Sequence, residues 1–363
     1  MVSDAQRAGA LKLAYKPDAA EAQERMRAFW RGEITDRPCV SIKAPLEGKK
    51  PPPLPQIVAP DFDFAAAIAR FEEWASCIFF GGESMPCLNP CWGPDQVAAF
   101  VGADLILSPE TDTSWAVPFV EDWNDIRSIT IDPDNRWWVG ILEFCRAAAE
   151  AGEGKFLVSS LDMHSNADCL AAIRGPARLC MDLIEQPEAI LRAMRWMNPL
   201  YTMVFDAVYD AGRMAERGGT NWLDMWGDGR TQSTECDFSY MVSPEHFRRF
   251  ILPALEHEIS YLDNAVYHLD GPGSLAHLDD LLAIPNLHGI QWAPGAGHGR
   301  MPEWIGLLQR IQRAGKSLHI GVTPDELRVI HSQILPDKTF YQVWDCGSES
   351  EASDLLRWIV AHT

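Results

Sequence analysis

The sequence lacks an apolar run long enough for a membrane-spanning helix, although 47% of its 363 residues are hydrophobic. Positive charge is also scarce, because 31 Lys and Arg stand against 51 Asp and Glu, for a formal net charge of −20. Such a surface repels phosphate backbones and anionic membrane surfaces. We therefore expect neither nucleic acid nor a membrane as a partner.

Cysteine is too scattered for a disulfide framework. The nine Cys are an odd number spread along the whole chain, which favours reduced thiols used for packing, metal binding or catalysis. The first ten residues contain no apolar core of the kind that a secretory signal has. These features predict a cytoplasmic protein that acts on a small molecule, and they leave the oligomeric state open.

No linker, internal repeat or Gly-rich phosphate-binding fingerprint divides the chain. From Cys39 onward, about eight short apolar runs alternate with helical patterns, as a (β/α)8 barrel of the TIM type requires. We predict one domain, residues 1–363, with a helical N-terminal extension at 1–37 and insertions in the loops. A doubly wound α/β sheet is the alternative, and the missing fingerprint weakens it. The predicted strands are 39–42, 79–82, 155–161, 220–225, 265–270, 287–292, 317–321 and 340–345.

Reactive side chains collect where these predicted strands end. His268 and Asp270 lie two positions apart at the end of strand 265–270, so they share one face of it. The carboxyl ends of barrel strands surround one mouth, which is where we expect His268 to meet Cys346. The other candidates at strand ends or on adjoining loops are Asp162, His164, Asn166, Trp226, Glu235, Cys236, Gln291 and Trp292.

Thiolate, imidazole and carboxylate together form a sensible zinc site. Each member also has a structural interpretation when taken alone. Cys236 and Cys346 suit small buried packing positions. Asp162 and His164 are residue types found in caps and turns.

Several segments resemble the uroporphyrinogen decarboxylase superfamily, which implies a TIM-type barrel. They are Tyr267-His268-Leu269-Asp270-Gly271-Pro272-Gly273, the run from Ile290 to Gly297, Ser243-Pro244-Glu245-His246-Phe247, Phe250-Ile251-Leu252-Pro253, and Cys346 with the Ser-Glu-Ser-Glu-Ala that begins at Ser348. The decarboxylase branch carries an arginine-rich Met-Arg-Gln-Ala-Gly-Arg stretch that holds substrate carboxylates, and this chain has Arg37-Pro38-Cys39-Val40 instead.

The other branch of that superfamily consists of zinc methyltransferases that serve corrinoid proteins and thiol substrates. Its members carry His-x-Cys on one strand and a second Cys near the last strand. The resemblance implies that His268 and Cys346 are metal ligands and that Asp270 replaces the first cysteine. Asp270 as an oxygen donor, Cys236 or Glu235 would then complete the set, or the metal is lost.

The sequence thus predicts a zinc-dependent methyltransferase that activates a thiol or acts with a corrinoid methyl carrier. The predicted ligands of Zn²⁺ are His268, Cys346, Cys236 and Asp270; the predicted catalytic residues are Asp162, His164 and Asp270; and the predicted substrate-binding residues are Trp226, Gln291, Trp292, Asn166 and Glu235. Two alternatives remain: a metal-free decarboxylase or lyase acting on a carboxylated substrate, and a non-catalytic protein that binds a corrinoid or a metal.

Overall fold

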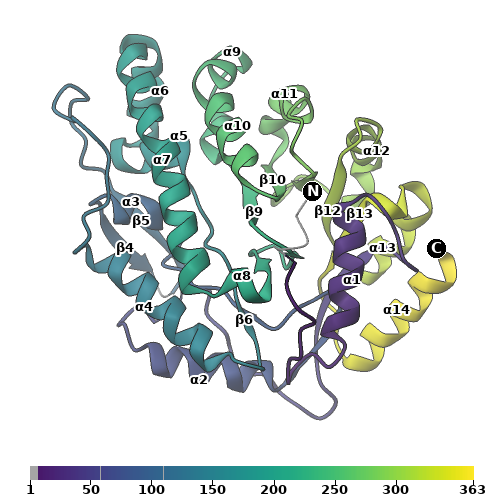
Figure 1. The fold of residues 1–363 in the computed structure, drawn as a ribbon. Coiled ribbons are helices and arrows are strands. Elements are labelled where there is room, and N and C mark those ends of the chain that lie inside the picture. Colours follow the sequence, from purple (N-terminus) through teal and green to yellow (C-terminus); the bar gives the residue numbers. More distant parts are fainter. Residues whose placement is uncertain (1–6, 58, 109) are drawn as a thin grey trace.

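The computed structural model describes residues 7–57, 59–108 and 110–363, and its centre is a seven-stranded sheet (Figure 1). The strands follow the order β2-β1-β13-β12-β11-β10-β9. Their bounds are β1 Cys39–Pro45, β2 Ile78–Gly82, β9 Thr231–Thr234, β10 Asn264–Asp270, β11 Gly289–Ala293, β12 Ser317–Val322 and β13 Thr339–Val343.

The sheet has barrel-like topology because its first and last long strands are neighbours. β1 pairs in parallel with β13, and every further pairing from β13 to β9 is parallel. This confirms an α/β fold with a mostly parallel sheet. β2 departs from the expectation, since it runs antiparallel along the other edge of β1.

Short strands continue the curve of the sheet without closing it. They are β3 Cys87–Leu88, β6 Leu157–Val158, β7 Gly219–Thr220 and β8 Trp226–Gly227. β3 pairs in parallel with β6, and the amide of Ser160 donates to the carbonyl of Thr220, 2.8 Å away, which ties β6 to β7. Among the strand pairings of the described residues, none joins β3 to β1. The predicted eight-stranded barrel is therefore open on this side.

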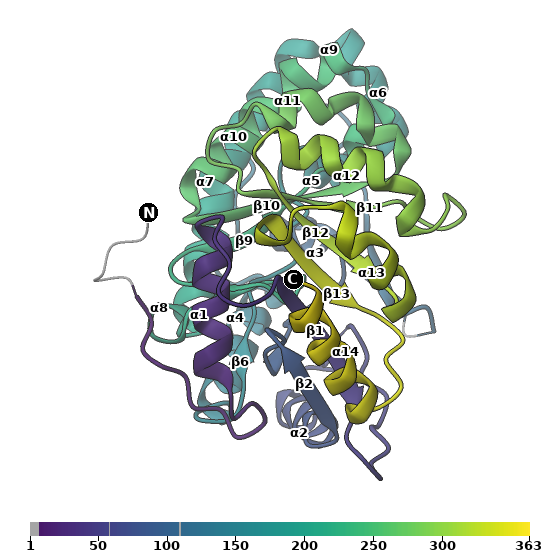
Figure 2. The same cartoon turned by 90° about the vertical axis from the view of Figure 1, so that its right-hand side faces the viewer.

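The helices surround these strands (Figures 1 and 2). None of them, in the part of the chain that the structure describes, is long and apolar enough to cross a bilayer. Their bounds are α1 Ala19–Trp30, α2 Phe64–Ala75, α3 Gln96–Phe100, α4 Arg136–Ala151, α5 Asn166–Arg174, α6 Pro176–Glu185, α7 Pro187–Ala211, α8 Met214–Arg217, α9 Pro244–His246, α10 Leu252–Tyr261, α11 Leu278–Leu282, α12 Ile305–Arg313, α13 Pro324–Ile330 and α14 Glu349–His362. A hairpin of β4 (Asp104–Ser108) and β5 (Thr113–Val117) lies in a region for which the sequence predicts no strand.

Two hydrophobic cores determine which end of the strands remains available. The larger core lies between the sheet and its surrounding helices. The smaller one joins α1 to side chains from the amino-terminal halves of several strands, including Cys39, Val266 and Phe340. Because α1 covers the amino ends, the carboxyl ends of the strands are left to form a site.

The predicted strand 220–225 is wrong. Only β7 is extended there, and the chain then turns and returns as β8, antiparallel to β7. Trp226 is consequently fully buried in the smaller core, where its Nε1 donates to the carbonyl of Arg217, 2.9 Å away. It packs against α1 and does not reach the mouth, so the structure does not support its predicted role in substrate binding.

Candidate metal centre

Three side chains from neighbouring strand ends form an accessible group, here called the open triad: Asp237, His268 and Asp270. β9 pairs in parallel with β10 up to Thr234 opposite Tyr267, and this register, continued past the end of β9, brings Asp237 beside Asp270. One ligand atom from each member of the triad lies within 4.8 Å of the others. Both carboxylates are exposed and His268 is half-buried, so the triad faces solvent.

The ring of His268 is held in one orientation by its neighbours. Gln291 lies opposite it on β11, and the Oε1 of Gln291 forms a hydrogen bond with the Nδ1 of His268. Because an amide oxygen only accepts, Nδ1 carries a proton, which leaves Nε2 as the nitrogen that is available to a metal. The indole of Trp222 packs edge-on against the ring, with the ring centroids 5.1 Å apart. Such supporting contacts are typical of a histidine that binds a metal through its other nitrogen.

A second group, here called the buried triad, consists of Asp162 and His164 from the loop after β6 and Glu235 from the end of β9. The Nε2 of His164 lies 3.6 Å from the Oδ2 of Asp162 and 3.9 Å from the Oε2 of Glu235. Exposure of the side chains is 15% for Asp162, 13% for His164 and 1% for Glu235. This triad is therefore almost closed to solvent.

Asp168, in the first turn of α5, holds the loop after β9 in place. Its carboxylate accepts hydrogen bonds from the backbone amides of Phe238 at 2.7 Å and Asp237 at 3.0 Å. The same carboxylate lies 3.4 Å from the Nδ1 of His164. Asp168 thus contacts both triads: it binds the backbone of the loop that carries Asp237, and it lies beside His164. These contacts hold the two triads next to each other.

Charge is unevenly distributed in the buried triad. Burial opposes ionisation of Asp162, but His164 and then a hydrogen bond from the acid form of Glu235 outweigh it and lower the pKa of Asp162 to about 2. Burial and the nearby Asp162 raise the pKa of Glu235 well above its usual range. Burial disfavours the imidazolium of His164, but Glu235 and Asp162 overcome this and raise its pKa. Without a metal, one carboxylate, one imidazolium and one neutral acid share the space.

The predicted ligand set of His268, Asp270, Cys236 and Cys346 is not assembled. Among the described residues, neither triad contains a cysteine. The Sγ of Cys236 is buried 3.6 Å from the Oδ1 of Asp168. Beyond β13 the chain turns through Asp345, whose φ is +58°, and Cys346 lies in the short segment before α14, with its Sγ 3.8 Å from the carbonyl of Ser348.

The other predicted substrate-binding residues divide between the site and its surroundings. Gln291 contacts His268, whereas Trp292 alternates to the outer face of β11 and packs on Trp304 with the ring centroids 4.9 Å apart. Asn166 is fully buried, and its Nδ2 donates to the carbonyl of Glu235 at 3.1 Å, so it supports the site from below. The structure does not place Trp292 at the mouth.

Sequence reasoning did not select Asp237 or Asp168 as site residues. The backbone stays extended through Cys236, so Glu235 and Asp237 point to the same side as Ser233. Alternation along an extended segment is therefore the sequence signal for Asp237. It does not stand out, because β9 has the sequence Thr-Gln-Ser-Thr, which is not typical of a buried strand.

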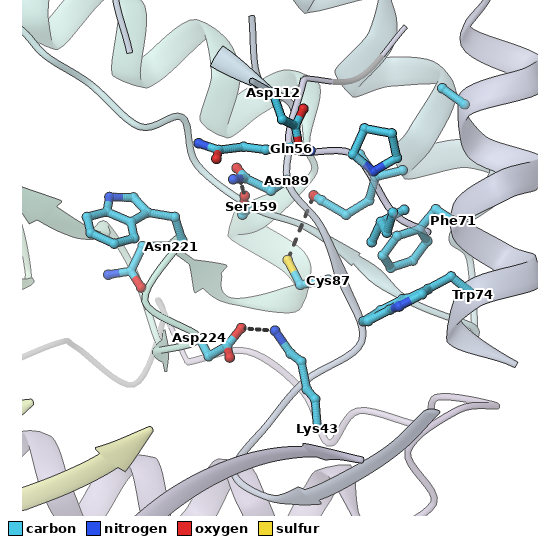
Figure 3. Close-up of a pocket in the computed structure, with 15 residues that line it drawn as sticks. Lys43, Gln56, Phe71, Trp74, Cys87, Asn89, Asp112, Ser159, Asn221 and Asp224 are labelled. Carbon is cyan, nitrogen blue, oxygen red and sulfur yellow. Dashed lines mark hydrogen bonds and ion pairs between the residues drawn. The ribbon is translucent and has the colours of Figure 1, made fainter. Parts of the chain in front are cut away.

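A cavity of about 290 Å³ lies at the open side of the barrel, between β1, β3 and the loop after β7 (Figure 3). Lys43 and Asp224 face one another across it as an ion pair, with Nζ 2.5 Å from Oδ1. Ser159 donates to Asn89 at 2.7 Å on the cavity wall. Trp222 also lines the cavity and packs against His268, so it connects the cavity with the open triad.

No family model matches this sequence, and no curated protein is similar enough to be matched. A search of solved structures finds a methyltransferase from Methanosarcina mazei, with a TM-score of 0.62 over 94% of this chain and 98% of that chain. The sequence identity is 13%, so the similarity shows a shared fold.

Both triads offer donors that suit a divalent cation. Imidazole and carboxylate ligands bind Zn²⁺ and other first-row divalent ions, and zinc sites that act on substrates keep one position open. In the open triad, the imidazole of His268 and two exposed carboxylates offer such donors, on a side that faces solvent. The donor set contains no thiolate, which distinguishes it from the set that the sequence predicts.

Proposed function

We propose that this protein is a metal-dependent methyltransferase whose metal is held by the open triad. The observation that carries the proposal is the meeting of His268 and Asp270 with Asp237 at the carboxyl ends of β10 and β9. The fold shared with a methyltransferase supports the reaction class. A thiol substrate, zinc as the native metal and a corrinoid methyl carrier belong to the same proposal.

The residues of the open triad have distinct tasks in this reaction. His268 presents Nε2 because Gln291 holds Nδ1, and Asp237 and Asp270 supply anionic oxygens. When bound, a divalent cation lowers the pKa of a thiol from about 8.5, so that the thiolate is available at neutral pH. The exposed carboxylates leave one side of the triad open for the substrate.

The cavity beside the triad sets the size of the substrate. Its volume of about 290 Å³ lies at the lower end of the range for small-molecule pockets. Asn89, Ser159 and Asn221 provide amide and hydroxyl groups for a polar substrate, and Trp222 forms the wall toward His268. A corrinoid is far larger than this cavity, so the methyl carrier approaches from the solvent side of the triad as a separate partner.

The decarboxylase alternative has less support. A carboxylated substrate needs cationic side chains, and the arginine nearest to β1 in the sequence, Arg37, is buried in a two-pronged ion pair with Glu83. Lys43 is the cationic residue that lines the cavity, and it is paired with Asp224.

The test measures metal content and methyl transfer together. The purified protein is loaded with Zn²⁺, desalted, and incubated without oxygen with methylcobalamin and a panel of small thiols. We expect zinc to bind and the absorption spectrum of methylcobalamin to change to that of cob(I)alamin as the thiol becomes a methyl thioether, with at least about a tenfold slower reaction for His268→Gln and Asp270→Asn. Asp125→Asn, which alters an exposed carboxylate outside both triads, should behave as wild type.

Three results would contradict the proposal. The first is less than about a tenth of an equivalent of zinc after supplementation, since affinity for the metal is the premise. The second is release of carbon dioxide from a carboxylated substrate without methyl transfer, which would favour the decarboxylase. The third is stable binding of a coloured corrinoid without turnover, which would favour a carrier protein.

A further inference from the structure

We propose that the buried triad of Asp162, His164 and Glu235 is a second binding site for a divalent first-row cation, beside the open triad. This site is separate from the one that carries the proposed methyl transfer. It does not require that activity, because the observations that support it concern only the buried triad and Asp168.

The distances within the buried triad fit ligands of one shared ion. Zinc binds nitrogen and oxygen ligands at about 2.1 Å, so two ligands at a tetrahedral angle lie about 3.4 Å apart. The Nε2 of His164 lies 3.6 Å from Asp162 and 3.9 Å from Glu235. Both separations are too long for hydrogen bonds, and a small inward movement of the carboxylates brings all three atoms to bonding distance of one cation.

His164 has the carboxylate partner that metal-binding histidines usually have. Asp168 lies 3.4 Å from Nδ1, on the side of the ring opposite Asp162 and Glu235. Asp168 is itself fixed by the backbone amides of Asp237 and Phe238. A carboxylate at Nδ1 holds the proton on that nitrogen and turns the lone pair of Nε2 toward the metal.

Two oxygens of the buried triad have no partner. The Oδ1 of Asp162 and the Oε1 of Glu235 are both buried and form no hydrogen bond within the described structure. The side chain of Glu235 is 1% exposed, and an unpartnered polar atom at that depth is costly. A bound cation supplies the missing interaction for both carboxylates, which distinguishes this triad from the exposed acidic groups common on protein surfaces.

The experiment counts bound metal in matched variants of the full-length protein. Wild type, Glu235→Gln in the buried triad and Asp237→Asn in the open triad are stripped with a chelator, loaded with Zn²⁺ and desalted. Zinc per chain is then measured by mass spectrometry. We expect two equivalents for wild type and one for each variant. Gln closely matches the neutral acid that Glu235 forms without metal, so this variant should fold, and circular dichroism checks that it does.

The outcomes separate the two sites. One equivalent that survives Glu235→Gln and disappears in Asp237→Asn would overturn the buried site and leave the metal of the proposed function in place. If wild type binds one equivalent that disappears in Glu235→Gln and is kept in Asp237→Asn, the buried site is supported and the open triad does not hold the metal. Absence of zinc in wild type, or loss of both ions from a folded Glu235→Gln protein, would overturn the separate buried site.

A second variant covers the case in which Glu235→Gln does not fold. Asp162→Asn changes the more exposed carboxylate of the buried triad. It should likewise bind one equivalent of zinc, and retention of two would count against the site. Loading with Mn²⁺ in parallel tests the metal class, because carboxylate-rich sets that contain one imidazole accept both ions.

Discussion

Replacing Glu258 by Gln should stabilise the protein at pH 8. Glu258 lies on α10, 2% exposed, and its carboxyl group accepts hydrogen bonds from Ser165 at 2.7 Å and Asn166 at 3.2 Å. Both donors are neutral, and the two hydrogen bonds do not offset the effect of burial, to which repulsion from Asp168 adds a smaller part. Burial therefore raises the pKa of Glu258 to about 8.

The size of the effect follows from the two protonation states. The unfolded chain loses this proton near pH 4.5, whereas the folded protein keeps it until about pH 8. Between these values the unfolded state binds fewer protons, so the free energy of unfolding falls as the pH rises. At about 1.4 kcal/mol per pH unit, the full interval corresponds to at most about 5 kcal/mol. Gln cannot ionise and escapes this loss.

Urea unfolding of wild type and Glu258→Gln at pH 5 and pH 8 measures the prediction. The two proteins should be nearly equally stable at pH 5, and the variant should be more stable by a few kcal/mol at pH 8. Glu256→Gln, which changes an exposed residue of the same helix, should show no such dependence on pH. If Glu258→Gln lowers stability equally at both values, Glu258 is ionised in the folded protein and the reasoning fails.

Three further substitutions test the fold and the site. In urea unfolding, Gly82→Ala should lower the free energy of unfolding by about 2 kcal/mol or more, because φ is +63° and the added Cβ would lie 2.0 Å from a carbonyl oxygen of β1. As a control, Gly306→Ala, which places its Cβ more than 4 Å from other atoms, should be neutral or stabilising. Arg27→Met should lower the free energy of unfolding by about 3 kcal/mol, because it leaves the buried Asp228 without the guanidinium that lies 2.7 Å from it. A decrease under about 0.5 kcal/mol in thermal or urea unfolding would show that this ion pair does not hold α1 in place. Cys346→Ser should keep the zinc content of wild type, and loss of an equivalent on elemental analysis would restore the cysteine as a ligand.

Much of the fold could be predicted because local signals determine local structure. The apolar runs at Cys39 and Leu318 become β1 and β12, and Ser243 caps the helix that follows, accepting from the amide of His246. β9 was not predicted, because its four residues are polar and the sequence gives no sign that all four are buried. The open side of the barrel was equally hidden, since the antiparallel pairing of β2 depends on contacts with β1 that composition does not encode.

The site was predicted where a single strand determines it. His268 and Asp270 both lie inside β10, so their common face follows from a spacing of two. The meeting of Asp162 with Glu235 depends on β9 and on Asp168, which come from different parts of the chain. The sequence therefore indicated the members of the buried triad separately and gave no sign that they share one space.

Cys346 was predicted to meet His268, and its actual position shows where prediction of side-chain direction from strand alternation stops being valid. Alternation of side chains predicts a direction only while the backbone remains extended. β13 ends at Val343, and the left-handed conformation of Asp345 breaks the alternation before Cys346 is reached. Burial and then Glu351 raise the pKa of the Cys346 thiol, which opposes formation of the thiolate that a metal needs. A ligand within a strand, such as His268, can be assigned from spacing, whereas a residue beyond the strand end needs an independent contact to fix it, as Asp168 does for the loop that carries Asp237.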